Sequence, residues 1–220
     1  ELRLNDSTNP GAGADDILTL SDGVNNVIAA FGADIINVGG GRNFVHGDEG
    51  RLDVLVDGSD RTLISTLNAT AGTPDDMDEI EIGAGFNVVV GGAARDVIDV
   101  KGTAVDSHSS IIGDNGKITL QTGSAVLLSI ESSDFDFGDK DLITLTAGTN
   151  VVIGGAGEDE ITSQAGNNTI LGDEGRAEFF ANGELRLIES TNLGAGADDV
   201  ITVSDGVNNV IAAFGADIIN

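Results

Sequence analysis

Aspartate residues recur in this chain at a regular spacing that divides them into pairs. An 18-residue spacing separates the members of each pair: Asp16 and Asp34, Asp78 and Asp96, Asp141 and Asp159, Asp199 and Asp217. Two carboxylates stacked at the strand spacing of ~4.8 Å repel each other unless a cation lies between them. Ca²⁺ accepts about six to eight oxygen ligands, which carboxylates and turn carbonyls can supply. If the fold stacks the members of each pair, these eight residues are the first candidates for metal ligands, with Ca²⁺ as the predicted ion.

The composition points the same way. Asp and Glu number 37 against 10 Lys and Arg, which gives a formal net charge of −27, yet 40% of the residues are hydrophobic. A chain that keeps both a core and so many acids needs something to neutralise the acids. Without a basic patch, nucleic acid and anionic membranes are disfavoured as partners. No run of about 18 apolar residues is present, so we expect no membrane insertion.

A nine-residue rhythm sets the spacing of the aspartates. Residues 145–171 divide into "LTAGTNVVI", "GGAGEDEIT" and "SQAGNNTIL", with Gly at the fourth place, Asp or Asn at the sixth and an aliphatic at the eighth. The register also fits 11–46, 73–99 and 194–220, whereas the nine at 100–112 is four residues too long. A glycine-rich turn followed by a short strand with one inward aliphatic is the unit of a parallel β-solenoid.

These nines resemble the calcium-binding nonapeptide repeat of RTX-type (hemolysin-type) proteins, G-G-x-G-x-D-x-U-x with U a large aliphatic. Residues 154–162, "GGAGEDEIT", match every fixed place, and 91–99, "GGAARDVID", lack one glycine. The resemblance implies that two nines make one 18-residue coil, that coils stack, and that Ca²⁺ lies between stacked turns. The expected fold is all-β, a parallel β-roll or β-solenoid with 18-residue coils interrupted by β-hairpin insertions.

The sixth place alternates between Asp and Asn, so the two edges of the solenoid should differ. Alternate nines lie on the same side, which stacks the aspartates on one edge and Asn25 on Asn43, and Asn150 on Asn168, on the other. Stacked asparagines need no ion, since each amide donates to the next carbonyl. We therefore predict one calcium-binding edge and one neutral edge.

Further acids are less certain candidates for ligands. One group lies near the first turn of each repeat block and the other in the tetrapeptides "GDEG" and "GDNG"; together they are Asp15, Asp48, Asp76, Asp114, Asp139, Asp173 and Asp198. For the first group the alternative is a solvated surface, and for the second a tight turn in which Asp bonds local backbone. The sequence alone leaves both readings open.

The tetrapeptides divide the chain into four blocks of one continuous solenoid: 1–50, 51–116, 117–175 and a truncated 176–220. Each of the last three blocks opens with an alternating segment that predicts a hairpin, with Asn182-Gly183 as its clearest turn. The ninth place on the neutral side is aliphatic where an exposed residue is expected, at Ile28, Val90, Ile112, Ile153, Leu171 and Ile211. Such a stripe is expected to be covered, either by these hairpins or by another chain.

A longer repeat suggests an excerpt from a larger array. Residues 184–220 match 1–37 at all but six positions, so that Glu184 corresponds to Glu1. The sequence starts with Glu1 and stops partway through this repeat, so we expect a window cut from a giant tandem-repeat protein. Its partners would be further copies of the same repeat, with self-association into a filament, bundle or layer.

The predicted function is structural: a calcium-stabilised extracellular or cell-surface segment of a filament, stalk or surface layer. The alternatives are an adhesin or a segment that binds ice or glycan, and an accessory repeat region of an enzyme or toxin. We expect no enzyme activity, because each Asp recurs in every block and the chain has no Tyr or Trp. His46 and His108 are expected in turns or loops of different blocks, so no catalytic group converges.

Overall fold

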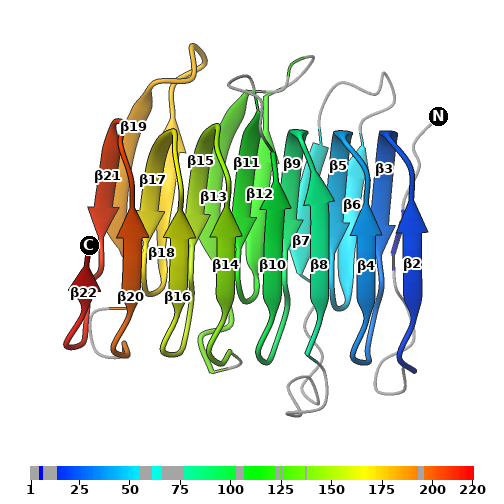
Figure 1. Ribbon diagram of the computed structural model, residues 1–220, viewed down its shortest axis with the longest axis horizontal. Helices are drawn as coiled ribbons and strands as arrows, with labels where there is room; N and C mark the ends of the chain where they lie inside the picture. The colour runs from blue at the N-terminus through cyan, green and yellow to red at the C-terminus, as the bar shows by residue number, and fades with distance from the viewer. Residues whose placement is uncertain are drawn as a thin grey trace.

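The structure is a stack of three β-sheets. The computed structural model describes residues 5–6, 14–54, 61–65, 77–102, 107–121, 124, 126–136, 138–192 and 196–220. Every regular element in these ranges is a strand, and the strands lie in three layers (Figure 1). The all-β prediction is confirmed, and no helix long and apolar enough to cross a membrane is present in the described ranges.

Eight parallel strands form the front layer in Figure 1, which we name the Asp sheet. In spatial order they are β2 (Ile17–Leu20), β4 (Ile35–Val38), β8 (Glu79–Gly83), β10 (Val97–Lys101), β14 (Leu142–Leu145), β16 (Glu160–Ser163), β20 (Val200–Val203) and β22 (Ile218–Ile219). Each begins directly after one of the eight candidate aspartates, so the nine-residue register fixes where these strands start.

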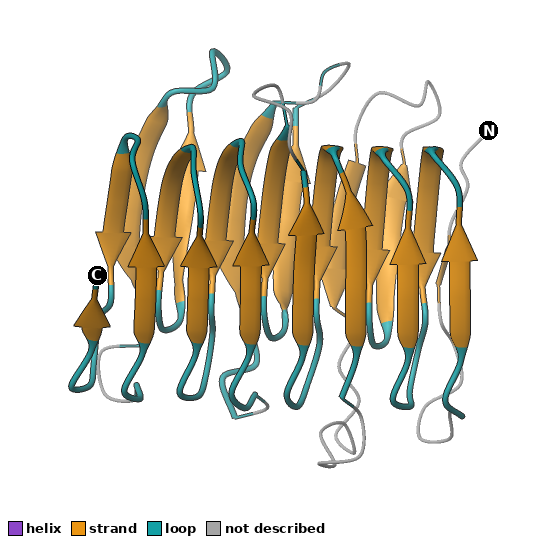
Figure 2. Cartoon of the chain, in the orientation of Figure 1, coloured by secondary structure: helices purple, strands orange, loops and turns teal. Residues whose placement is uncertain are grey.

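Seven parallel strands form the middle layer, the Asn sheet. They are β3 (Gly23–Ile28), β5 (Gly41–His46), β9 (Gly85–Val90), β11 (His108–Ile112), β15 (Thr149–Ile153), β17 (Asn167–Leu171) and β21 (Asn208–Ile211). Turns and loops join the Asp sheet and the Asn sheet at both edges of the roll (Figure 2). Together the two sheets are the predicted parallel β-roll.

Seven antiparallel strands form the third layer, the hairpin sheet. They are β1 (Asn5–Asp6), β6 (Gly50–Val54), β7 (Arg61–Ser65), β12 (Gly116–Leu120), β13 (Leu127–Ser132), β18 (Gly175–Phe179) and β19 (Leu185–Ser190). Strands of successive hairpins also pair, β7 with β12 and β13 with β18. The hairpins are therefore one continuous sheet, and the predicted turn at Asn182-Gly183 is confirmed by the pairing of β18 with β19.

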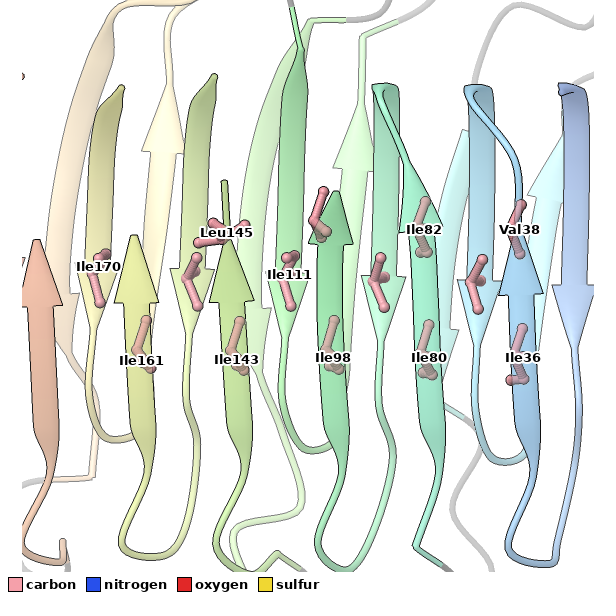
Figure 3. Packing of buried hydrophobic residues seen from close by; sticks show 14 of the residues in the cluster. Ile36, Val38, Ile80, Ile82, Ile98, Ile111, Ile143, Leu145, Ile161 and Ile170 are labelled. Carbon is pink, nitrogen blue, oxygen red and sulfur yellow. The ribbon is translucent and has the colours of Figure 1, made fainter. Parts of the chain in front are cut away.

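Eighth-place aliphatic residues fill the space between the Asp sheet and the Asn sheet. Their side chains form rows along the roll (Figure 3), and those of Ile80, Ile98, Ile143 and Ile161 have no exposed surface. A second row in the same core comes from Val38, Ile82, Val100 and Leu145, each two residues further along its strand of the Asp sheet.

A second apolar layer lies between the Asn sheet and the hairpin sheet. Val90, Ile112, Ile153 and Leu171 of the ninth-place stripe are fully buried there against hairpin residues such as Ile118. Ile28 and Ile211, on the outermost strands of the Asn sheet, are half-buried. Hairpins of the same chain thus cover the stripe, which agrees with the first of the two alternatives from the sequence.

Each hairpin interrupts a turn that leads from the Asn sheet to the Asp sheet. Strands β6 and β7 lie between β5 and β8 in the chain, β12 and β13 between β11 and β14, and β18 and β19 between β17 and β20. The insertion does not disturb the stacking, because β4 still pairs with β8 and β10 with β14 in parallel register. The aspartates that precede β8, β14 and β20 therefore stay in line with the others.

Both histidines lie in strands, which corrects the expectation that they occupy turns or loops. His46 ends β5 and is fully buried under the hairpin sheet, and His108 begins β11 with an exposed side chain. Burial lowers the pKa of His46 to about 3. His46 lies in line with Val90 of β9 and Ile112 of β11. Strand β5 therefore continues up to the residue directly before "GDEG".

Candidate metal centre

The eight aspartates that precede the strands of the Asp sheet form one continuous column, which we call the Asp ladder. In every step the backbone N–H of one aspartate donates to Oδ1 of the next, at 2.7 to 3.0 Å, through Asp16, Asp34, Asp78, Asp96, Asp141, Asp159, Asp199 and Asp217. The sequence predicted four separate pairs. The structure joins them, because steps of 44, 45 and 40 residues across the hairpins alternate with steps of 18 residues.

The second carboxylate oxygens of the Asp ladder point into a buried space. Oδ2 of Asp96, Asp141, Asp159 and Asp199 is shielded from solvent and has no hydrogen-bond partner among the residues described. A buried charged oxygen without a partner costs several kcal/mol, on the order of a lost charged hydrogen bond or more. These atoms are the observation that calls for a cation.

Backbone carbonyls line the same space. A Cβ atom on Gly154 would lie 2.3 Å from Asp159 Oδ2 and 2.3 Å from the carbonyl oxygen of Gly172. A Cβ atom on Gly113 would lie 1.9 Å from Asp141 Oδ2 and 2.5 Å from the carbonyl oxygen of Gly154. Glycine is required at both positions because a side chain would collide with the oxygens. Each coil therefore offers a carboxylate oxygen and a carbonyl oxygen side by side.

Electrostatics of the ladder favour a bound cation over free carboxylates. Burial raises the pKa of the Asp96 carboxyl well above its usual range, and the charges of Asp141 and Asp78 raise it further. Burial likewise raises the pKa of Asp159 well above its usual range, with the charge of Asp141 next in importance. Burial raises the pKa of Asp199 to about 7. Without a bound ion, the charges of neighbouring carboxylates in the ladder repel one another.

The donor set fits Ca²⁺. In the described part of the chain, no three His, Asp or Glu side chains converge on one point. An ion at the ladder would thus take carbonyl oxygens together with one or two carboxylates, and would have only hard oxygen ligands. Such a mixed oxygen shell is typical of Ca²⁺, whereas Zn²⁺ prefers nitrogen and sulfur ligands in a tetrahedral site.

The acids of the tetrapeptides cap the next turn of the roll. Asp48 Oδ2 accepts a hydrogen bond from the backbone N–H of Ala93 at 2.5 Å, and Asp114 Oδ2 accepts one from Ala156. Asp173 accepts two backbone hydrogen bonds, from Phe214 at 2.6 Å and from Ala197 at 3.1 Å. All three side chains are buried beside the ladder. The turn-capping alternative from the sequence thus describes their contacts, and a role as metal ligand stays a prediction.

The remaining candidates lie at the surface or outside the described residues. Asp15, Asp139 and Asp198 are exposed, and each accepts a backbone hydrogen bond, from Ala33, Lys140 and Ala216 respectively. Asp76 lies outside the described residues. At the two ends of the ladder Asp16 is exposed and Asp217 is half-buried, since no further coil covers them.

Asparagines form a matching column, the Asn ladder, at the other edge of the roll. The side-chain amide of Asn25 donates to Asn43 at 2.9 Å, Asn43 to Asn87 at 2.9 Å, Asn150 to Asn168 at 2.9 Å and Asn168 to Asn208 at 2.7 Å. The column joins the two predicted asparagine pairs to Asn87 and Asn208. These amides are neutral, as expected for an edge that needs no ion.

Ser109 occupies the step of the Asn ladder between Asn87 and Asn150, and sequence reasoning missed it. Its hydroxyl and the Asn150 Oδ1 atom are buried without a hydrogen-bond partner among the described residues, so the chain of amide bonds is interrupted there. The available signal was the overlong nine at 100–112, in which Ser109 stands two residues before the inward aliphatic Ile111.

A parallel β-roll whose turn edge carries a column of buried carboxylates beside backbone carbonyls is typical of a calcium-binding repeat protein. The family model of the RTX calcium-binding nonapeptide repeat (4 copies) matches residues 19–51, 81–100 and 144–176. The chain therefore contains RTX calcium-binding nonapeptide repeats, which bind Ca²⁺. No curated protein and no solved structure matched the chain.

Proposed function

We propose that this chain is a structural element: a calcium-stabilised, extracellular β-roll segment of a filament, stalk or surface layer. The observation that carries the proposal is the Asp ladder, which runs through every coil of the roll and places the same carboxylate in each step. A site repeated in every coil suits a structural ion better than a catalytic group, which occurs once per active site.

The setting outside the cell is supported by the charge. A chain of net charge −27 with a column of buried acids folds only where cations are plentiful. Extracellular modules commonly bind Ca²⁺ at about 10⁻⁴ to 10⁻³ M, near its concentration outside cells. RTX repeats occur typically in secreted proteins, which supports this setting.

Continuity of the roll supports a rod rather than a string of separate domains. The proposed block boundary near residue 50 is bridged by β4 with β8 and by β5 with β9. The boundary near residue 116 is bridged by β10 with β14 and by β11 with β15. We infer that the four sequence blocks are stretches of one solenoid, since strand pairing passes each boundary in both sheets of the roll.

The outer face of the Asp sheet argues against a flat neutral surface for ice or glycan. One outward column of this sheet consists of Thr19, Asn37, Glu81, Asp99, Thr144, Thr162 and Thr202. Lys101 forms ion pairs with Glu81 and, at 3.7 Å, with Asp99 in the middle of this face. These charges interrupt the threonines, so a regular hydroxyl array does not extend along the roll.

The proposal is tested by folding the chain with and without calcium. Far-UV circular dichroism and unfolding curves would be recorded across a Ca²⁺ titration, in EGTA, and in Mg²⁺ at equal ionic strength. We expect β-structure to appear with Ca²⁺ in the millimolar range and not with Mg²⁺, because folding is coupled to ion binding. Full β-structure in EGTA would refute the calcium-dependent fold. Electron micrographs of longer arrays would then show whether they form rods.

A further inference from the structure

One strand of the Asn sheet departs from the repeat. Strand β11 lies in the overlong nine at 100–112, and its Ser110 stands in line with Val88 of β9 and Val151 of β15. Both valines pack in the apolar layer between the Asn sheet and the hairpin sheet, so the Ser110 side chain faces the same layer. Because a serine side chain is smaller than the valines on either side of it, it leaves space in this layer.

That space is part of a cavity of about 440 Å³ between the Asn sheet and the hairpin sheet. Strands β9, β11 and β15 supply one wall, and the other wall comes from β13, β18 and the turn that joins β18 to β19. The volume lies within the ~300–1,000 Å³ that is usual for sites that bind small molecules. Both sheets of the roll separate this cavity from the outer face of the Asp sheet.

Apolar side chains form most of the wall. Phe86, Leu127, Val151 and Phe179 all line the cavity, so two of its apolar groups are aromatic rings. Arg42 of β5 lies over the Phe86 ring, at 5.3 Å from the ring centroid, and helps to hold the ring in place. The cavity therefore offers apolar and aromatic surface to a ligand.

Polar side chains line the same cavity. Ser110 is 6% exposed, and its hydroxyl forms no hydrogen bond with any described residue. His108, Thr149 and Asn182 also line the cavity and are exposed, so they lie toward the solvent. A ligand in the cavity would thus meet a buried hydroxyl that needs a partner and further polar groups near the opening.

Charge and polarity together restrict the ligand. No Asp, Glu, Lys or Arg is among the described residues that line the cavity, so a charged ligand would find no ion pair there. The net charge of −27 also repels anions. A wholly apolar ligand would bury the Ser110 hydroxyl without a partner, which weakens binding. A neutral sugar ring satisfies both conditions, because its C–H groups pack on aromatic faces and its hydroxyls form hydrogen bonds.

We propose that this cavity binds the pyranose ring of a neutral sugar, with Ser110 as its buried hydrogen-bonding group. The site lies where the nine-residue pattern is broken, away from the repeated aspartates of the calcium edge. It adds a binding function to the structural role, and it does not depend on whether the roll belongs to a filament, a stalk or a layer.

The test is a titration of the chain, folded in Ca²⁺, with glucose, galactose, mannose and N-acetylglucosamine, followed by amide NMR spectra. Indole is titrated separately as an apolar, aromatic probe. We expect at least one sugar to give saturable shifts in β11, in β15 and at residues 180–183, with a dissociation constant in the millimolar range that is usual for so small a ligand.

Substitutions at Ser110 then test the site itself. Ser110→Ala removes the hydroxyl with little change in volume and should weaken sugar binding about tenfold. Ser110→Val copies the residue of both neighbouring strands, fills the space and should abolish binding. Thr169→Val is the matched control, because Thr169 is a buried residue in line with Val151 and is not among the residues that line the cavity. It should leave sugar binding unchanged.

Two results would overturn the inference. One is the absence of saturable shifts at these residues with all four sugars, whether or not indole produces them; shifts with indole alone would show an apolar site. The other is sugar binding that Ser110→Ala and Ser110→Val leave as strong as in the parent. The spectra of the variants without ligand show whether each one keeps the fold. Either negative result, obtained with a folded chain in Ca²⁺, leaves the proposed structural function standing.

Discussion

Asp199→Asn separates two effects that a ladder carboxylate has on the fold: the cost of burying its charge, and the stability gained when that charge binds Ca²⁺. Asp199 Oδ1 accepts the backbone N–H of Asp159 at 2.9 Å, and its own N–H donates to Asp217 at 3.0 Å. An asparagine keeps an oxygen for the first bond and leaves the second intact. The substitution removes the charge on Oδ2, the buried oxygen that has no hydrogen-bond partner among the described residues.

The size of the effect is set by the pKa. Burial is the main reason why the Asp199 pKa is about 7 in the fold, compared with an ordinary value of 3.8. A raised pKa costs nothing below pH ~4, where the carboxyl is protonated in both states, and costs the full amount above pH ~7. Three pH units correspond to about 4 kcal/mol, which we halve to ~2 kcal/mol because β22, the strand that covers this step of the ladder, is itself exposed to water.

With the free energy of unfolding extrapolated to zero Ca²⁺ at pH 8, the Asp199→Asn variant is therefore expected to be more stable than the parent by ~2 kcal/mol. In Ca²⁺ the order should reverse, because the variant has lost a charged ligand. We expect the lost ligand to cost more than the ~2 kcal/mol gained, so that the calcium midpoint of folding rises about tenfold, a net loss of ~1.4 kcal/mol. Equilibrium urea unfolding at pH 4, 6 and 8 over a series of Ca²⁺ concentrations measures both quantities, because the dependence on Ca²⁺ can be extrapolated to zero Ca²⁺.

Asp205→Asn is the matched control, because Asp205 is an exposed aspartate on the other edge of the roll and the substitution changes the net charge equally. His46, whose pKa burial lowers to about 3, destabilises the fold below pH 6.5 in all three proteins, so the readout is the difference between proteins at each pH. An Asp199→Asn variant whose unfolding free energy, extrapolated to zero Ca²⁺ at pH 8, is lower than that of the parent, or that shares the calcium midpoint of Asp205→Asn, would refute the reasoning.

Three further substitutions test other layers of the roll. Asn168→Asp removes the amide that donates to Asn208 at 2.7 Å, so we expect the free energy of unfolding in urea to fall by more than about 2 kcal/mol, and added Ca²⁺ not to restore it. A loss that added Ca²⁺ restores would contradict a neutral edge. Ala94→Gly relieves a positive φ of 78° and should raise the unfolding free energy by ~0.5–1 kcal/mol, whereas a decrease would contradict strain at this turn. Ile112→Ala empties a fully buried site under the hairpin sheet and should cost ~2–5 kcal/mol in the same assay; a change below ~1 kcal/mol would mean that the hairpins cover the Asn sheet only loosely.

The sequence predicts the roll well because each fixed place of the nine has one structural task. Asp159 stands at the sixth place and directly precedes β16, and Ile161 at the eighth place points into the interior. The alternation of Asp and Asn separates the two edges for the same reason, since alternate half-coils return to the same side of the roll.

Contacts across the insertions could not be predicted from the spacing. Asp34 and Asp78 are far apart in the chain, and the ladder bond between them forms because the intervening hairpin folds outward onto the Asn sheet. Nothing in the local sequence states that the hairpin leaves the stacking of β4 on β8 unchanged. The joining of four pairs into one ladder is a property of the tertiary structure.

The roles of single polar residues were predicted least well. Asp48 was ambiguous between cap and ligand, because either role places a carboxylate at a tight turn. Its contact with Ala93 describes the cap, and the ligand role stays a prediction. Ser109 was hidden by four extra residues that break the register. His46 was predicted in a turn or loop because it directly precedes "GDEG", a turn motif. The residues in line with it on the neighbouring strands are aliphatic, so the pattern did not indicate a histidine there.

The continuous pairing of the hairpins has a mechanical consequence. Resistance to bending rises steeply with the thickness of a layered beam, and sheets packed face to face add about 10 Å per layer. Because β7 pairs with β12 and β13 with β18, the third layer carries load along the whole length and does not act as separate flaps. Its strands run antiparallel and bond laterally to their neighbours, so a lateral force on the roll is shared between two kinds of sheet. A three-layer roll of this kind resists buckling better than a two-sheet roll of equal length.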